Sequence, residues 1–295
     1  MKRELIRNAL TFDIEDFENS IYLHYFNISM PPSNIVEQLT LKIIDILYEL
    51  KVKATFFVLG EIVMAFPNVI RRIVSDGHEI AVHGWNHKRV YYMNRFEFSE
   101  SVGKTKKLIE DMTGVRVLGY RAPAMSIKRN INLYDSLIEL GFVYSSSLFT
   151  MKGMSLKNVK RHNGIYIISG LNASILEIPL SAVKIFCFNV PILGGSYLRL
   201  LPFFVNKIGL KIYERRKKPS VIYIHPYELD ILYNPRKLLT KNNDLIKKGL
   251  IKLFILSQKI NRSKTEYKIK CLSRMSLFGP IRQVFKDDID TLMRK

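Results

Sequence analysis

Short apolar runs, which predict strands, alternate with longer stretches whose apolar residues recur at helical spacing through the first half of the chain. The helical spacing is clear in Ile35–Leu50, at Leu39, Ile43 and Leu47, and again in Arg95–Thr113, which Gly114 closes. Strands that alternate with helices over brief connections are typical of a parallel sheet covered by helices. The sequence therefore predicts a parallel α/β fold.

The same pattern sets the expected elements and domains. The predicted strands are Ala9–Asp13, Ala54–Leu59, Glu79–Val82, Val117–Arg121, Phe142–Tyr144 and Val221–Ile224, and the predicted helices are Ile35–Leu50, Asn68–Asp76, Arg95–Thr113 and Ile131–Leu140. The pattern loosens between Met151 and Pro219, where we expect an irregular insertion with short strands at Gly164–Ser169 and Ser174–Ile178. Beyond it the chain is mostly helical and basic. We predict a barrel over residues 1–235 and a helical extension, packed on its outside, over residues 236–295.

The chain is basic, with a formal net charge of +20. Such a charge suits a polyanion or an anionic membrane surface. No nucleic-acid module is recognisable, so we expect no nucleic-acid partner and interpret most of the charge as solvated helix faces. The stretch Leu245–Leu256 combines apolar residues with lysines. We favour a helix packed on the barrel there, with peripheral contact to an anionic membrane as the alternative.

The N-terminus leaves no room for a secretion signal, because the first predicted strand begins at Ala9. No window reaches the ~18–20 apolar residues that a transmembrane helix needs. We therefore expect a cytoplasmic protein, with any membrane contact at the inner face.

Polar clusters follow the predicted strands at four places. They are the carboxylates Asp13, Glu15 and Asp16, the pair His83 and His87, Arg121, and His225. Each cluster alone has a simpler explanation, such as a helix cap, a buried ion pair or a core histidine. The carboxyl ends of parallel strands meet at one end of an α/β fold, where active sites lie. The convergence of four clusters therefore favours a catalytic site.

The residue types fit a metal-assisted hydrolase, which needs three protein ligands, a base and an acid. His83 and His87, four residues apart, can bind one divalent metal. One carboxylate of the first cluster can be the third ligand and another the base, while His225 can be the acid and Arg121 can orient the base. We expect Zn²⁺, although Co²⁺, Ni²⁺ or Fe²⁺ would suit the same ligands.

These motifs resemble the NodB-homology polysaccharide deacetylases, carbohydrate esterase family four. The motifs that carry the resemblance are Thr11–Asp13, His83–His87, Arg121–Ala124 and Ile224–His225. Further segments resemble the branch associated with exosortase and exopolysaccharide loci, namely Asp13–Phe17, Gly194–Pro202 and His225–Asp230. The resemblance runs from Leu10 to Asp230 and implies an irregular (β/α)7-type barrel.

The resemblance implies hydrolysis of N-acetyl groups on hexosamine units of a glycan or a lipid-linked saccharide precursor. Asp13 would activate the attacking water, and His83, His87 and one acidic residue would hold the metal. The metal and a backbone N–H near Ala124 would stabilise the oxyanion. His225 would protonate the departing amine.

The sequence departs from the family pattern at two positions. Ile14 stands where the family has a second aspartate, so the third ligand must be Glu15 or Asp16. We lean to Asp16, because a short carboxylate at a turn loses less side-chain entropy on binding. Ser145 stands where the family's fourth motif has an aspartate that supports the arginine or the histidine.

Candidate substrate contacts complete the hypothesis. Residues Gly194–Pro202, with Tyr197 and Arg199, could form a substrate-side loop or a tight turn between core segments. Trp85 could stack on a sugar, although we lean to a core role. Two alternatives remain open: an allantoinase-like amide hydrolase acting on a small molecule, and a glycan- or membrane-binding protein that has lost catalysis. The oligomeric state cannot be read from the sequence.

Overall fold

The computed structural model describes residues 7–129, 132–149, 159–170, 172–185, 188–234 and 249–294. Within this part of the chain, a ten-stranded sheet has the order β11-β1-β2-β3-β4-β5-β8-β7-β6, and β12 pairs with the start of β1. The seven strands from β11 to β8 pair in parallel, whereas β7 and β6 continue the sheet as antiparallel strands. The predicted parallel α/β fold is therefore confirmed.

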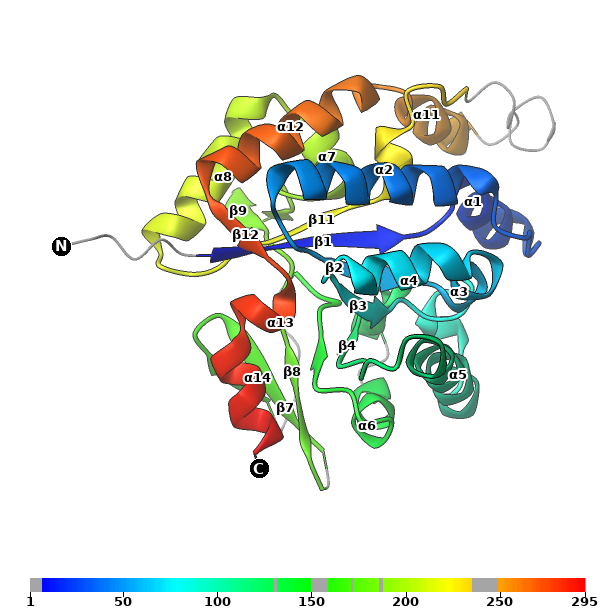
Figure 1. The fold of residues 1–295 in the computed structure, drawn as a ribbon, viewed down its shortest axis with the longest axis vertical. Coiled ribbons are helices and arrows are strands. Elements are labelled where there is room, and N and C mark those ends of the chain that lie inside the picture. Colours follow the sequence, from blue (N-terminus) through cyan, green and yellow to red (C-terminus); the bar gives the residue numbers. More distant parts are fainter. Residues whose placement is uncertain are drawn as a thin grey trace.

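The strands and helices have the following bounds (Figure 1). The strands are β1 Arg7–Ile14, β2 Thr55–Val58, β3 Glu79–Val82, β4 Gly119–Tyr120, β5 Tyr144–Ser145, β6 Val159–His162, β7 Ile165–Ser169, β8 Ser174–Glu177, β9 Val183–Ile185, β10 Phe188–Val190, β11 Val221–Ile224 and β12 Leu277–Gly279. The α-helices are α1 Phe17–Phe26, α2 Asn34–Leu50, α3 Gly60–Ala65, α4 Pro67–Ser75, α5 Arg95–Thr113, α6 Leu133–Glu139, α7 Gly195–Leu200, α8 Phe203–Arg215, α11 Gly249–Ser257, α12 Arg262–Met275, α13 Ile281–Val284 and α14 Lys286–Met293. Short 3-10 turns η1, η2 and η3 span Val90–Tyr92, Pro123–Arg129 and Pro226–Leu229.

The central strand β1 explains why the polar clusters converge. It pairs with β11 on one side and with β2 on the other, and its residues from Ala9 to Ile14 are buried. Because the neighbouring strands run parallel, their carboxyl ends meet at the end of the sheet toward which the β1 arrow points (Figure 1). Just after β8, the backbone N–H of Ser181 donates a hydrogen bond to the carbonyl of Val221 in β11 at 3.1 Å. This irregular link joins the two ends of the parallel run.

Most of the predicted elements are present, with shifted ends. β3 and α5 have the predicted bounds, whereas the strand predicted at Val117–Arg121 shortens to Gly119–Tyr120. Helix α1 was not predicted, and neither was strand β12, which the otherwise helical C-terminal region adds to the sheet beside Arg7–Ala9. The predicted domain boundary at residues 235 and 236 lies outside the described residues. Among the described helices, none is long and apolar enough to cross a bilayer.

Candidate metal centre

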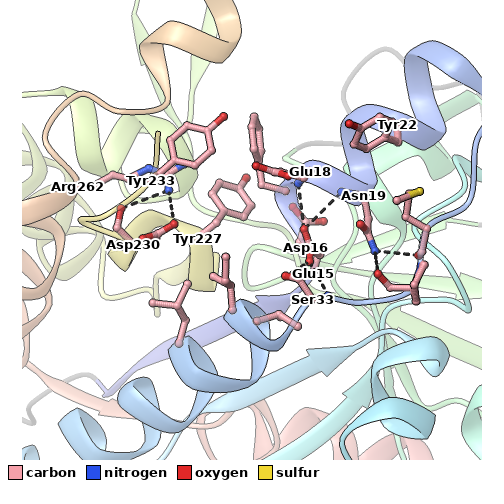
Figure 2. Close-up of a pocket in the computed structure, with 16 residues that line it drawn as sticks. Glu15, Asp16, Glu18, Asn19, Tyr22, Ser33, Tyr227, Asp230, Tyr233 and Arg262 are labelled. Atoms are coloured by element: carbon pink, nitrogen blue, oxygen red, sulfur yellow. Dashed lines mark hydrogen bonds and ion pairs between the residues drawn. The ribbon is translucent and has the colours of Figure 1, made fainter. Parts of the chain in front are cut away.

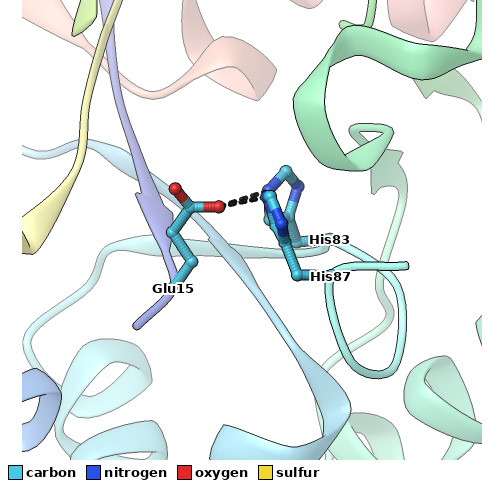
Figure 3. Close-up of side chains that lie close together, drawn as sticks. All are labelled: Glu15, His83 and His87. Atoms are coloured by element: carbon cyan, nitrogen blue, oxygen red, sulfur yellow. Dashed lines mark ion pairs between the residues drawn. The ribbon is translucent and has the colours of Figure 1, made fainter. Parts of the chain in front are cut away.

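Glu15, His83 and His87 bring three potential metal donors together at the carboxyl ends of β1 and β3. One ligand atom from each lies within 4.8 Å of the others, and all three side chains are buried. The Glu15 Oε2 atom lies 3.7 Å from His83 Nε2 and in closer contact with His87 Nε2. Figure 3 shows the Glu15 carboxylate facing both rings. Two imidazoles and a carboxylate are the donor set of many catalytic zinc sites.

The histidine rings are oriented by partners behind them. His83 Nδ1 donates to the Arg121 carbonyl at 2.9 Å, which leaves the Nε2 lone pair turned toward Glu15. His87 has a left-handed backbone, with φ of 54°, and its Nδ1 lies 3.2 Å from Ser20 Oγ and 3.1 Å from His24 Nε2. Such second partners fix the tautomer and the ring plane of a metal-binding histidine.

The Glu15 carboxylate fits a cation. Burial would raise the pKa of this carboxyl, but the His87, His225 and His83 rings outweigh burial and hold it well below its usual range. Its buried Oε2 atom has no hydrogen-bond donor. A buried carboxylate that faces two imidazole lone pairs is stabilised by a metal ion between them. The residues present therefore fit a divalent metal, and the chain supplies at least three of its ligands.

Asp16 is engaged elsewhere, so the geometry does not support our lean to it as the third ligand. Its Oδ1 accepts from the backbone N–H groups of Glu18 and Asn19, as the N-cap of α1. Its Oδ2 accepts from the backbone N–H and the hydroxyl of Ser33. The entropy argument failed because it ignored the helix that begins at Phe17, whose first N–H groups compete for a short carboxylate.

Asp13 and Arg121 form a buried ion pair next to the donors. Arg121 Nη1 donates to Asp13 Oδ1 at 2.6 Å and to Thr11 Oγ1 at 2.8 Å, and the guanidinium also donates to Ser146. The pair is sealed from solvent, with side-chain exposures of 0% for Arg121 and 1% for Asp13. The second carboxylate oxygen, Asp13 Oδ2, has no hydrogen-bond partner. One oxygen is thus fixed while the other can accept a proton.

His225 faces both carboxylates from β11. Its Nε2 lies 3.9 Å from Asp13 Oδ2 and 3.7 Å from Glu15 Oε1, too far for a direct hydrogen bond. Burial alone would lower the pKa of His225, but the Glu15, Glu228 and Asp13 carboxylates raise it to about 9. A protonated imidazole in this place can donate a proton.

Glu228 holds His225 from behind. Its Oε1 accepts from His225 Nδ1 at 2.7 Å, and its Oε2 lies 3.8 Å from Arg199 Nε. Glu228 and Arg199 are completely buried. The Tyr227 ring stacks on His225 with 4.8 Å between centroids and 8° between planes. His225 is therefore fixed in position by the turn that follows it.

The substitution at Ser145 changes a buried network rather than leaving a charge without a partner. Ser145 Oγ lies 2.8 Å from Ser147 Oγ, and the nearby Glu177 accepts from the backbone N–H groups of Ser147 and Leu148 at 2.8 Å each. Arg121 pairs with Asp13, and the histidine pairs with Glu228. The two groups that the family aspartate would support therefore have other partners here.

The candidate substrate contacts have mixed positions. Ala124 is exposed and, with Met125, has the left-handed backbone that side chains rarely adopt, with φ of 50° and 51°. Trp85 packs against Gly60, where an added Cβ would come within 2.3 Å of its ring, and Lys104 lies 3.9 Å over the ring. Trp85 is half-buried, so its role, in the core or against a sugar, stays a prediction.

The Gly194–Pro202 segment forms α7 and packs on the core. A Cβ on Gly194 would lie 2.1 Å from the Tyr223 ring, so the paired glycines allow a close backbone approach to a core side chain. Tyr197 is 46% exposed, so it remains a candidate for substrate contact. Arg199 is 0% exposed and donates to Gln258 and to the Ser257 carbonyl, which corrects its assignment as a substrate contact.

Sequence reasoning missed three residues of the site: Ser20, His24 and Glu228. Ser20 and His24 lie on the unpredicted helix α1, so only the recognition of Asp16 as an N-cap could have indicated them. Glu228 had a signal in the sequence, because it stands three residues after His225 across a proline. A proline-started turn places residues three apart on one side.

Comparison with known proteins relates the two halves of the chain to two families. Residues 8–144 match the polysaccharide deacetylase family, and residues 146–286 match a domain of unknown function, DUF3473. A peptidoglycan-N-acetylglucosamine deacetylase of Bacillus cereus is 36% identical over 93 residues, which are 32% of this chain and 34% of that protein. The chain thus aligns with about a third of that relative. Residues 8–144 are therefore similar to the polysaccharide deacetylase family, and residues 146–286 are similar to DUF3473.

Solved structures share the fold. A polysaccharide deacetylase structure from Mycobacterium smegmatis, described as putative, has a TM-score of 0.63 at 20% identity and covers 100% of this chain and 92% of its own. A CE4 family pseudoenzyme from Bacillus anthracis has a TM-score of 0.50 at 14% identity, over 95% of this chain and 66% of its own. At these identities the likeness concerns the fold alone. It confirms the deformed α/β barrel with a helical C-terminal region.

Proposed function

We propose that the protein is a metal-dependent N-deacetylase that acts on hexosamine units of a glycan or a lipid-linked saccharide precursor. The position of Asp13 and His225 close to each other and beside the metal donors carries the proposal. Asp13 Oδ2 lies 3.9 Å from His225 Nε2, and this nitrogen lies 3.7 Å from Glu15 Oε1. Amide hydrolysis needs a base and an acid in this relation to one electrophilic centre.

The residues would divide the work as follows. A divalent metal held by Glu15, His83 and His87 would polarise the amide carbonyl and balance the charge on its oxygen. Asp13 Oδ2 would take a proton from the attacking water, while Arg121 holds the other oxygen in place. His225 would give a proton to the departing amine, and Glu228 would keep its ring directed at the site. Acetate and a free amino sugar would leave.

Two finer points of the sequence hypothesis stay predictions: Zn²⁺ as the metal, and an exopolysaccharide pathway at a cytoplasmic or membrane-proximal location. Arg121 is paired with Asp13, and His225 is paired with Glu228, although Ser145 stands in place of the family aspartate. These two pairs support an active enzyme over a catalytically weakened binding protein.

Acetate release from N-acetylglucosamine oligomers by the metal-loaded protein tests the proposal. We expect turnover in wild type and a loss of at least about a hundredfold in Asp13→Asn, which removes the base. His162→Ala is a surface control, because His162 is exposed and lies on β6. This variant should turn over the substrate like wild type. Turnover of allantoin without glycan turnover would instead establish a small-molecule amide hydrolase. Metal binding without turnover of either substrate would favour a binding protein.

A further inference from the structure

Helix α11 exposes an apolar surface. Its sequence, Gly-Leu-Ile-Lys-Leu-Phe-Ile-Leu-Ser, holds one charged residue, Lys252. Ile255 is fully buried and anchors the helix in a small cluster with Phe17. Leu253, Phe254 and Leu256 are 64%, 45% and 37% exposed. Among the side chains of α11 that the structure describes, one large apolar side chain is buried and three are exposed, and residues 245–248 of the stretch expected to pack on the barrel lie outside the described residues.

The turn after η3 extends this surface. Ile231 and Leu232 are 61% and 87% exposed, next to Tyr233. The rings of Tyr233 and Phe254 both contact Phe17, at centroid distances of 5.7 and 6.0 Å. We call the five exposed residues the α11 patch: Ile231, Leu232, Leu253, Phe254 and Leu256. A group of large exposed apolar side chains of this kind marks a site of contact with another apolar phase.

The α11 patch lies beside the candidate metal centre. Phe17 lines a pocket of about 790 Å³, part of it open to solvent, and Glu15 lines the same pocket. Figure 2 shows Tyr227, Tyr233 and Arg262 on one side of this pocket and Glu15 and Glu18 on the other. In Figure 1, α11 lies beside α1, at the end of the sheet toward which β1 points. The patch and the metal donors therefore share one end of the molecule.

The charge around the patch selects its partner. From Gly249 to Lys264 the chain has no acidic residue, and Lys252, Lys259 and Lys264 are exposed. A second copy of this protein would bring the same charges and a formal net charge of +20, which opposes close approach. An anionic bilayer offers both an apolar phase for the leucines and negative charge for the lysines.

We propose that the α11 patch docks the protein on an anionic lipid bilayer. Leu253 and Phe254 would enter the boundary between headgroups and acyl chains, with Lys252 and Lys259 at the headgroup phosphates. The pocket beside Glu15 would then open next to the membrane surface. This docking does not require metal binding or catalysis.

Co-sedimentation with vesicles tests the proposal. Wild type should bind phosphatidylglycerol vesicles and not phosphatidylcholine vesicles at low salt, and Leu253→Glu should weaken the partition by roughly tenfold or more. Phe96→Glu is the matched control: it makes the same change of charge on α5, where Phe96 is 76% exposed. This control should bind like wild type. His83→Ala should also bind like wild type, which separates docking from the proposed catalysis.

Three outcomes would overturn the proposal. Wild type could fail to bind anionic vesicles at low salt. Phe96→Glu could lose as much binding as Leu253→Glu, which would assign the attraction to net charge alone. Wild type could form a dimer in solution that Leu253→Glu dissociates, which would make the patch an interface between copies.

Discussion

Replacement of Glu228 by glutamine tests how the structure positions its histidine. Glutamine keeps the size of the side chain and an acceptor for His225 Nδ1, so the variant removes only the charge from a 2.7 Å hydrogen bond. A hydrogen bond to a charged group contributes about 1.5–3 kcal/mol. Because about 1.4 kcal/mol corresponds to a factor of ten, kcat should fall by about 10- to 100-fold. KM should change little, since Glu228 is buried behind the histidine.

Arg199 complicates the variant, because Glu228→Gln leaves its buried guanidinium without a counter-charge. The double variant Arg199→Met/Glu228→Gln removes both charges. We expect it to recover thermal stability while its kcat stays as low as in the single variant. Deacetylation kinetics and a melting curve for each variant measure the two effects. A kcat within twofold of wild type in Glu228→Gln, or a full recovery of kcat in the double variant, would refute the positioning role.

Glu15→Gln should weaken metal binding by roughly 10- to 100-fold in a competition titration with a chelating dye. Asp16→Asn should retain the affinity and lower the unfolding free energy by about 1 kcal/mol, because an amide NH2 replaces the oxygen that accepts from the Ser33 N–H and hydroxyl. Equal losses of affinity would contradict the assignment of Glu15. Glu177→Ala should cost about 2–5 kcal/mol of stability in urea titrations, because it strands the N–H groups of Ser147 and Leu148, whereas Glu177→Gln should cost much less. Burial raises the pKa of Glu177, so wild type should lose stability relative to Glu177→Gln as the pH rises from the unfolded toward the folded pKa, and a constant difference would refute this.

The gathering of polar residues at the carboxyl ends of the parallel strands was the best-predicted feature of this protein. The apolar runs before Asp13, His83 and His225 were long enough to identify from the sequence, and parallel pairing then brought the three residues to one end. The choice between Glu15 and Asp16 could not be predicted in this way. Both follow the last residue of β1, so strand alternation no longer fixes their direction, and the outcome depends on a helix whose apolar residues have no clear helical spacing.

Arg199 shows a second limit of sequence reasoning. An arginine in a glycine-rich stretch resembles a substrate contact, but its burial depends on Glu228 and on the 257–260 turn, which lie far along the chain. The same turn leads into α12, so Arg199 and Glu228 connect the C-terminal region to His225. Pairings of this kind follow from tertiary packing, which local patterns do not encode.

Metal content of the purified protein, by elemental analysis, tests the central claim most directly. Wild type and the surface control His162→Ala should each hold about one equivalent of a divalent metal, and His83→Ala should hold little. Wild type that stays empty after incubation with zinc or cobalt, or His83→Ala that retains a full equivalent, would contradict the site built from Glu15, His83 and His87.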